Sequence, residues 1–189
     1  MVAGHFGFAA IVKSREKAAP LWALMLATVW LDIVFMPLFL THRESVQPIH
    51  PGYGGMIIHA NYTHSIVGML ALSPLLGAMF LPKLGRRVAS VIALVSASHW
   101  VLDLVVHRAD MPVFPGNFGK LPYLGFGLWN RPAVAACAEL LLVLAGAFMY
   151  WRAAIDVSAK GGRRGKLASL SAAMIAACGL LVLFLDYTS

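Results

Sequence analysis

Long apolar stretches separated by short polar segments are the feature that most constrains this chain. A transmembrane helix needs about 20 consecutive apolar residues to cross the hydrocarbon core of a bilayer. The 189 residues are 60% hydrophobic and only 12% charged, whereas soluble domains carry roughly 25% charged residues. We therefore predict an all-α polytopic membrane bundle of about five transmembrane helices, forming a single transmembrane domain over residues 1–189. The predicted spans are Leu21–Leu40, His64–Leu81, Val88–His107, Pro132–Arg152 and Leu167–Leu185.

Four shorter features modify this pattern of spans. The apolar segment Met1–Val12 is too short to cross the membrane, and we expect a short N-terminal half-helix that is half inserted or interfacial. Pro37 lies inside the first predicted span and is expected to kink it. Thr41–Asn61 is rich in Pro, Gly and His, which indicates a loop, and Lys83–Arg87 indicates a tight basic turn.

Basic residues predict the orientation of the bundle. They form three clusters that fall on the same side of a five-span chain, and the positive-inside rule makes that side cytoplasmic. The C-terminus is then expected outside. The net charge of +7 comes from these clusters and not from a continuous basic stripe, so we expect membrane lipid and no nucleic acid as partner. The clusters are Lys13, Arg15 and Lys17; Lys83, Arg86 and Arg87; and Arg152, Lys160, Arg163, Arg164 and Lys166.

Several histidines and acidic residues lie within or beside the apolar runs. A charge at membrane depth costs at least ~2.5–3.5 kcal/mol on insertion scales, so such residues are functional candidates. At a rise of about 1.5 Å per helical residue, they converge on one layer in the outer half of the membrane. Histidine and aspartate on separate segments at one depth indicate a transition-metal site, and we predict one or two zinc ions there. The predicted ligands are His5, Asp32, His59, His64, His99 and Asp103.

The spacing of two of these residues favours shared ligation. His99 and Asp103 are one helical turn apart and therefore lie on one face of a helix. His107 continues that face, although an interfacial pair with Asp110 is the alternative interpretation. A lone intramembrane histidine or aspartate more often joins helices by a hydrogen bond, so a scaffold without metal remains an alternative for each single residue.

Glu139 is the catalytic candidate. It is the only acidic residue within the fourth predicted span, and its estimated depth matches that of Asp103. An apolar setting raises the pKa of a carboxyl group, which suits it to general acid–base proton transfer. The alternative is a polar contact with Asn130 or Arg131.

Four motifs follow one another in the first 60% of the chain. Together they resemble the membrane-bound metal-dependent hydrolase family, whose best-known bacterial members are inner-membrane proteins under DNA-damage control. The motifs are Gly4-His5-Phe6-Gly7-Phe8-Ala9, Leu31-Asp32-Ile33, His59-Ala-Asn-Tyr62-Thr63-His64-Ser65, and Ser98-His99-Trp-Val-Leu-Asp103 followed by Met111-Pro112-Val-Phe-Pro115.

The resemblance implies a metal-dependent hydrolase in a bacterial-type inner membrane. Two departures bear on the number of metals and on activity. The family's acidic segment usually reads Asp-x-Asp-His, whereas this chain has Asp32-Ile33-Val34-Phe35. The family's Arg-Gly after the first histidine of the third motif is Ala60-Asn61 here.

A buried site favours a lipid or lipid-linked ester or phosphoester as substrate, hydrolysed in the outer half of the membrane. The apolar loop Arg108–Arg131 is then expected to act as a lid. The alternative function is a non-catalytic metal-binding membrane protein, either an accessory subunit or an ion or proton conduit, because His and Asp chains also make relays.

Overall fold

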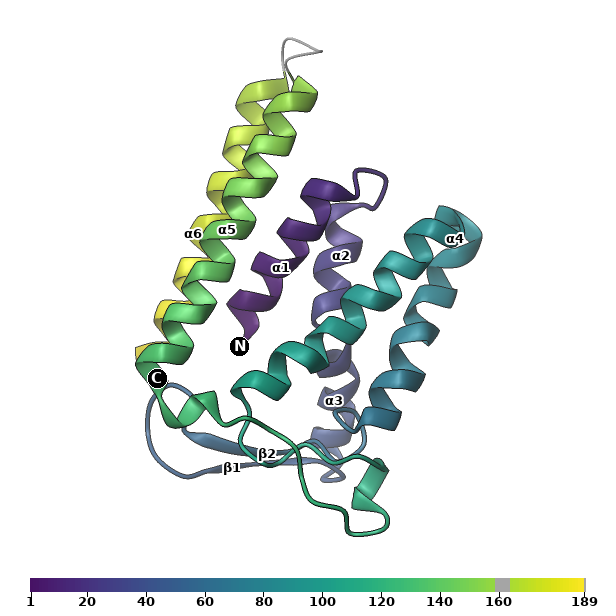
Figure 1. Cartoon of the computed structure of the whole chain (residues 1–189), viewed down its shortest axis with the longest axis vertical. Helices are drawn as coiled ribbons and strands as arrows, with labels where there is room; N and C mark the ends of the chain where they lie inside the picture. Colours follow the sequence, from purple (N-terminus) through teal and green to yellow (C-terminus); the bar gives the residue numbers. More distant parts are fainter. Residues whose placement is uncertain (159–163, 189) are drawn as a thin grey trace.

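The computed structural model describes residues 1–158 and 164–188 as a helical bundle with a small sheet and loops at one end (Figure 1). Within that part, three helices are long and apolar enough to cross a membrane, or four if the bent pair α2–α3 is one span. This confirms the predicted all-α class but not five spans. The elements are α1 (Val2–Arg15), α2 (Leu21–Thr28), α3 (Trp30–Leu40), β1 (Ser45–Pro48), β2 (Met56–His59), α4 (Ile66–Val106), the 3₁₀ turns η1 (Pro115–Asn117) and η2 (Leu128–Asn130), α5 (Pro132–Ser158) and α6 (Arg164–Thr188).

The N-terminal helix α1 lies inside the bundle, between α5 and α2 (Figure 1). Its contact with α5 is made by backbone against backbone. A Cβ atom on Gly7 would lie 2.5 Å from the backbone oxygen of Leu142, and one on Gly146 would lie 2.2 Å from that of Gly7. Glycine is therefore required at both positions for this approach. The close packing buries His5 in the interior of the molecule.

The first predicted span is broken at Val29 and not at Pro37. α2 and α3 meet there at an angle of 46°, and Pro37 lies inside α3. In a continuous helix the carbonyl of Thr28 would accept the N–H of Asp32. It instead accepts a hydrogen bond from Nδ1 of His99, at 2.6 Å. A tertiary contact therefore satisfies the carbonyl at the break, which places Asp32 in the first turn of α3.

α4 contains the predicted second and third spans, and its two arms meet at Gly85. This residue has φ 75° and ψ 168°, a conformation that favours glycine, and it falls within the predicted basic turn. Figure 1 shows this bend at the end of the bundle where α1 turns into α2. Arg87 forms an ion pair there with Glu16, at 2.9 Å. Two basic clusters thus share one end, while Lys160 and Arg163 of the third lie outside the described residues.

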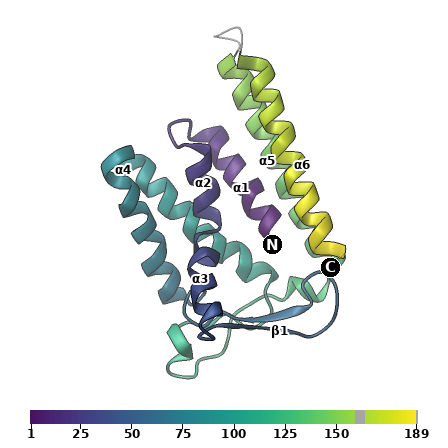
Figure 2. The same ribbon diagram turned by 180° about the vertical axis from the view of Figure 1, so that it is seen from behind.

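The opposite end carries an antiparallel hairpin within the predicted loop Thr41–Asn61. The pairing runs from Ser45 opposite His59 to Pro48 opposite Met56. Figure 2 shows from behind that the N-terminus of α1 lies above this hairpin, between α3 and the C-terminal end of α6. The hairpin therefore closes the end of the bundle below the start of α1.

The long loop Arg108–Arg131 crosses the same end of the bundle. Met111 and Trp129 are buried, whereas Phe118 and Phe126 are largely exposed. Arg108 anchors the loop to the hairpin because its Nη1 donates to the carbonyls of Gly54 and Met56. Some apolar side chains of the loop therefore pack against the bundle, and others face outward.

Candidate metal centre

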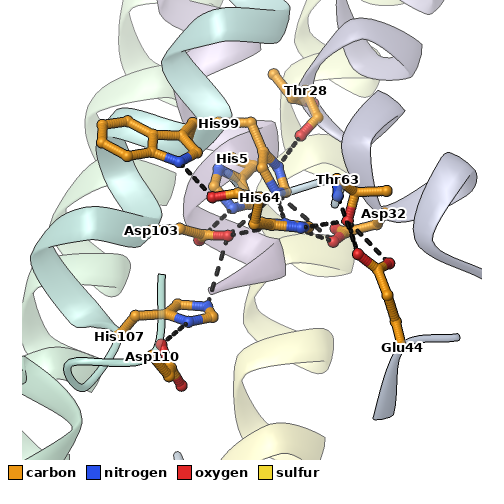
Figure 3. Close-up of polar contacts among 11 residues, drawn as sticks. His5, Thr28, Asp32, Glu44, Thr63, His64, His99, Asp103, His107 and Asp110 are labelled. Carbon is orange, nitrogen blue, oxygen red and sulfur yellow. Dashed lines mark hydrogen bonds and ion pairs between the residues drawn. The ribbon is translucent and has the colours of Figure 1, made fainter. Parts of the chain in front are cut away.

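Five of the predicted ligands meet between α1, α3 and α4 (Figure 3). Two groups of three have ligand atoms within 4.8 Å of one another. His99 belongs to both groups. Four of the five side chains are at most 5% exposed, while that of Asp32 is 40% exposed. The cluster is thus buried on every side but that of Asp32. The groups are His5, His99 and Asp103, and Asp32, His64 and His99.

His99 is fixed in one tautomer by the break in the first span. Its Nδ1 lies 2.6 Å from the carbonyl oxygen of Thr28, which can only accept, so Nδ1 carries the proton. The neutral ring then presents a lone pair on Nε2. That atom lies 3.1 Å from Oδ2 of Asp103 and 3.5 Å from Oδ1 of Asp32.

His64 is oriented by a buried carboxylate through a hydroxyl group. The backbone N–H of Thr63 and its hydroxyl both donate to the Glu44 carboxylate, at 2.9 and 3.1 Å. Because the hydroxyl has a single proton, its oxygen accepts the 2.9 Å hydrogen bond from Nδ1 of His64. In the neutral His64 ring, Nε2 therefore carries a lone pair, as Nε2 does in the neutral His99 ring.

The two lone pairs face each other at short range. Nε2 of His64 and Nε2 of His99 lie 3.1 Å apart. Each nitrogen also lies within 3.7 Å of both carboxylates, Asp32 and Asp103. With both rings neutral, two lone pairs and two negative charges repel one another in a buried site, and either a metal cation between them or a proton on one ring offsets this repulsion.

The separations match those of ligands on a single zinc ion. Zinc binds imidazole nitrogen and carboxylate oxygen at about 2.0–2.2 Å, so tetrahedral ligands lie roughly 3.3–3.6 Å from one another. The two histidine Nε2 atoms lie 3.1 Å apart, and their four separations from the Asp32 and Asp103 oxygens range from 3.1 to 3.7 Å. Two imidazoles favour zinc or another transition metal over calcium or magnesium. The donor set therefore fits the metal that the sequence predicts.

His5 supports the cluster from α1. Its ring stacks on that of His99 with a centroid distance of 4.1 Å, and Nε2 lies 3.0 Å from Oδ1 of Asp103. Nδ1 is buried and has no hydrogen-bond partner among the described residues. His5 thus contacts the second oxygen of Asp103 and is close enough to the other donors to be a ligand.

His59 and Glu139 are not brought together with this cluster. His59 lies in β2, and its Nε2 is 3.4 Å from Oε1 of Gln47 on the neighbouring strand. Glu139 is fully buried, where it accepts hydrogen bonds from the N–H of Gly4 and the hydroxyl of Tyr53, at 2.9 and 2.6 Å. Burial and this carboxylate raise the pKa of Tyr53 above its ordinary value. Glu139 thus joins α5 to α1 and to the hairpin loop.

His107 and Asp110 form the pair that the sequence offered as an alternative. Nδ1 of His107 donates to Oδ1 of Asp110 at 2.9 Å, and both residues are buried. The other ring nitrogen of His107 faces the cluster, 3.7 Å from Oδ2 of Asp103.

A cavity of about 390 Å³ opens from the cluster. Its polar part includes His64, Asp103 and Asp32. Its apolar part includes Phe35 and Met36 of α3, and the side chain of Met36 is about half exposed. The cavity thus connects the polar cluster with an apolar surface. Glu139 does not line it.

The residues that orient the ligands were not found from the sequence. Thr28 acts through a backbone carbonyl, which no residue type reveals. Glu44 is an acidic residue in a polar loop, where a solvated side chain is the usual interpretation. Thr63 belongs to a sequence motif and, with Asn61, indicates a helix N-terminus nearby. Its position directly before His64 is the sequence signal that could have identified it.

Comparisons of the chain with protein-family models, with curated proteins and with solved structures found no match. The geometry of the cluster and its cavity is therefore the basis for assigning a function.

Proposed function

We propose that the protein is a membrane-embedded hydrolase that uses a metal ion, most simply zinc, held by His64, His99, Asp32 and Asp103. The observation that carries the proposal is the approach of two imidazole Nε2 atoms to 3.1 Å beside two carboxylates. A bound zinc ion would acidify a water molecule and polarise a phosphoryl or acyl oxygen. The chain itself supplies the fixed tautomers, the buried second carboxylate and the exclusion of bulk water.

The accessible side of the cluster supports hydrolysis over simple metal storage. A closed structural site surrounds its ion, whereas a catalytic site keeps an open position. Asp32 is 40% exposed while its partners are almost fully buried, so the open side of the cluster is next to α3. The cavity begins on that side. A water molecule or substrate oxygen entering the cavity would therefore meet the ion beside Asp32, either as a fifth ligand or in place of the Asp32 carboxylate.

The apolar wall of the cavity supports a lipid or lipid-linked ester or phosphoester as substrate. Phe35 and Met36 follow Asp32 by three and four residues on α3, so they extend from the polar cluster along one face of the helix. Met36 is 49% exposed, on a helix of the bent candidate span. An acyl chain can contact this face while its head group reaches Asp32. The long loop Arg108–Arg131 crosses the same end and is proposed as the lid.

The five-span arrangement belongs to the same proposal. The break at Gly85 divides α4 into arms of roughly 20 residues, each sufficient for one crossing. The Arg87–Glu16 ion pair supports a common basic end, which is proposed to be cytoplasmic. The C-terminal end of α6 lies at the opposite end, beside the hairpin (Figure 2). The site would then lie in the outer half of a bacterial-type inner membrane.

Two other functions are consistent with part of the geometry. A non-catalytic metal protein, either an accessory subunit or an ion or proton conduit, would use the same donors. A helix-joining scaffold would hold a protonated His99 against Asp103 without a metal, as their 3.1 Å contact permits. The open cavity beside Asp32 favours the hydrolase, and metal bound by the purified protein would decide against the scaffold.

Metal content and lipid hydrolysis test the proposal together. Wild-type protein, His99→Ala and His59→Ala are purified in detergent, and bound transition metal is measured by elemental analysis. We expect metal in wild type and in His59→Ala, and little in His99→Ala, because His59 contacts Gln47 and not the cluster. Equal metal in wild type and His99→Ala would contradict the metal centre.

The same preparations are then assayed on lipid carboxylic esters and phosphoesters in mixed micelles. Hydrolysis that is lost with a chelator and returns with zinc supports the hydrolase. Bound metal without hydrolysis of either class of lipid would favour the non-catalytic alternative.

A further inference from the structure

His107 has the orientation of a metal ligand that the sequence motifs do not include. We infer that its Nε2 binds the cation held by Asp103, so that the centre has a third imidazole beside those of His64 and His99. This inference rests on the proposed metal centre and adds a residue to it. Nε2 of His107 lies 3.7 Å from Oδ2 of Asp103.

The hydrogen bonds of His107 determine which nitrogen is free. Nδ1 donates to Oδ1 of Asp110 at 2.9 Å, and a carboxylate can only accept. Asp110 is held in turn, because its Oδ2 accepts the N–H of Ile58 at 3.1 Å. The neutral ring therefore presents a lone pair on Nε2. A carboxylate behind the distal nitrogen of a histidine is the usual support of a metal-binding imidazole.

The distance to Asp103 fits a shared cation better than a hydrogen bond. At 3.7 Å the two atoms are beyond hydrogen-bond range. Two ligands about 2.1 Å from one ion lie roughly 3.4 Å apart at the tetrahedral angle and roughly 4.2 Å apart on opposite sides. The observed separation falls between these values. Both residues are buried, so a lone pair opposed to a carboxylate is unfavourable without a positive charge between them.

The surroundings hold the ring in this orientation. The His107 ring packs on that of Trp129 with a centroid distance of 4.4 Å, and it stacks towards His64 at 6.3 Å. His107 also lines the cavity that opens from the cluster. It therefore extends the donor set along α4 by one turn beyond Asp103, in the direction of the hairpin.

Two substitutions separate ligation from a structural role. His107→Asn places an amide near Nδ1, so it keeps a donor for Asp110 and removes Nε2. His107→Gln places its amide near Nε2 and loses the donor for Asp110. If His107 is a ligand, His107→Asn should weaken metal binding by more than the ~10–100-fold that loss of a supporting residue causes. If it only supports Asp110, His107→Asn should behave as wild type and His107→Gln should not.

The experiment titrates the metal-free protein in detergent with Co²⁺ and follows its visible absorption, which responds to ligand number and type. The control is His42→Asn, because His42 is exposed and has φ 57°, a conformation that asparagine tolerates. We expect a wild-type spectrum for the control and a weaker, altered spectrum for His107→Asn. A wild-type affinity and spectrum in His107→Asn would overturn the inference while leaving the metal centre intact.

Two further outcomes are distinguishable. Absence of Co²⁺ binding by wild type would overturn the proposed metal centre itself, and this inference with it. Because His107 lines a cavity, both variants are expected to keep the helical content and elution volume of wild type. Loss of fold in both variants, with metal bound by wild type, would show a structural role for His107 and overturn its assignment as a ligand.

Discussion

At the scale of single residues, the hydroxyl of Thr63 controls the chemistry of the imidazole next to it. It accepts from Nδ1 of His64 only because its own proton is directed to the Glu44 carboxylate. Removing the hydroxyl leaves Nδ1 without an acceptor, so the tautomer with a free Nε2 is no longer selected. In the proposed metal centre, the Glu44 carboxylate therefore acts on His64 through the hydroxyl oxygen of Thr63.

Thr63→Val is expected to weaken metal binding by about 10–100-fold, because valine keeps the shape of threonine but not its hydroxyl. The control variant Thr63→Ser is expected to bind metal as wild type does, since serine keeps the hydroxyl group that donates to Glu44 and accepts from His64. The measurement is a competition titration with a chromogenic chelator. Wild-type affinity in Thr63→Val, with both variants folded, would show that His64 is oriented by other contacts.

A second residue-scale prediction concerns Glu139, which we assign to holding α1 in place. Glu139→Gln replaces one accepting oxygen with an amide group that faces a donor, either Gly4 N–H or the Tyr53 hydroxyl. Hydrogen bonds to charged groups are worth about 1.5–3 kcal/mol, so we expect a loss of stability of that order with metal content unchanged. Thermal unfolding in detergent measures it.

The catalytic interpretation of Glu139 predicts a different result. A general acid–base would lose about 10²–10⁴-fold in rate on the change to glutamine, with stability kept. Rate and stability measured on the same preparation therefore decide between the two roles.

At the scale of elements, the packing of α1 against α5 positions His5. Gly7 and Gly146 permit the two backbones to touch, and a side chain on Gly7 would meet the carbonyl of Leu142. Backbone cannot move aside as a flexible side chain can, so α1 would have to shift. His5 lies two residues before Gly7 and would shift with it relative to Asp103.

Gly7→Ala is therefore expected to destabilise the protein by about 1–3 kcal/mol or more and to weaken metal binding. The control is Leu181→Ala, on the exposed side of α6, which should alter neither property strongly. Thermal unfolding and metal content are measured on both. An unchanged metal affinity in Gly7→Ala would mean that His5 and the α1–α5 contact do not contribute to the site.

Of the two helix breaks, the sequence predicted the one in α4 but not the one between α2 and α3. Apolar runs and the basic turn predicted the helices of α4 and its break, because length and a glycine between basic residues are local signals. The break at Val29 has no such local signal. The carbonyl at that break is bonded to His99, 71 residues away, whereas the proline that the sequence shows, Pro37, lies inside α3 and not at the break.

At the scale of the whole molecule, the rise per helical residue predicted the depth of each polar side chain but not the direction in which it points from its helix. His5, Asp32, His64, His99 and Asp103 were predicted at one level, and the structure brings them together. Glu139 was predicted near that level, but it faces Gly4 and Tyr53. Its direction depends on the rotation of α5, which hydropathy does not determine. The hairpin that carries His59 was expected as a loop, so its pairing with Gln47 was not foreseen.

The proposed topology predicts which ends a membrane-impermeant thiol reagent can reach. In a background with both native cysteines replaced by serine, we introduce His50→Cys at the hairpin and Lys83→Cys at the α4 bend, both at exposed positions. Intact cells should label position 50 and not position 83 if the basic end is cytoplasmic, as proposed. Permeabilised cells should label both. Labelling of both positions, or only of position 83, in intact cells would refute the orientation.

The bond between Thr28 and His99 has a consequence for the order of events during synthesis. The residues of α2 and α3 leave the ribosome well before His99 has been made. Until then the Thr28 carbonyl has no partner at this position, and an unpaired carbonyl is unfavourable in the hydrocarbon. We therefore expect the first span to enter the membrane as one straight helix. We expect it to bend only when the second arm of α4 arrives, so that the proposed metal centre would form late in assembly.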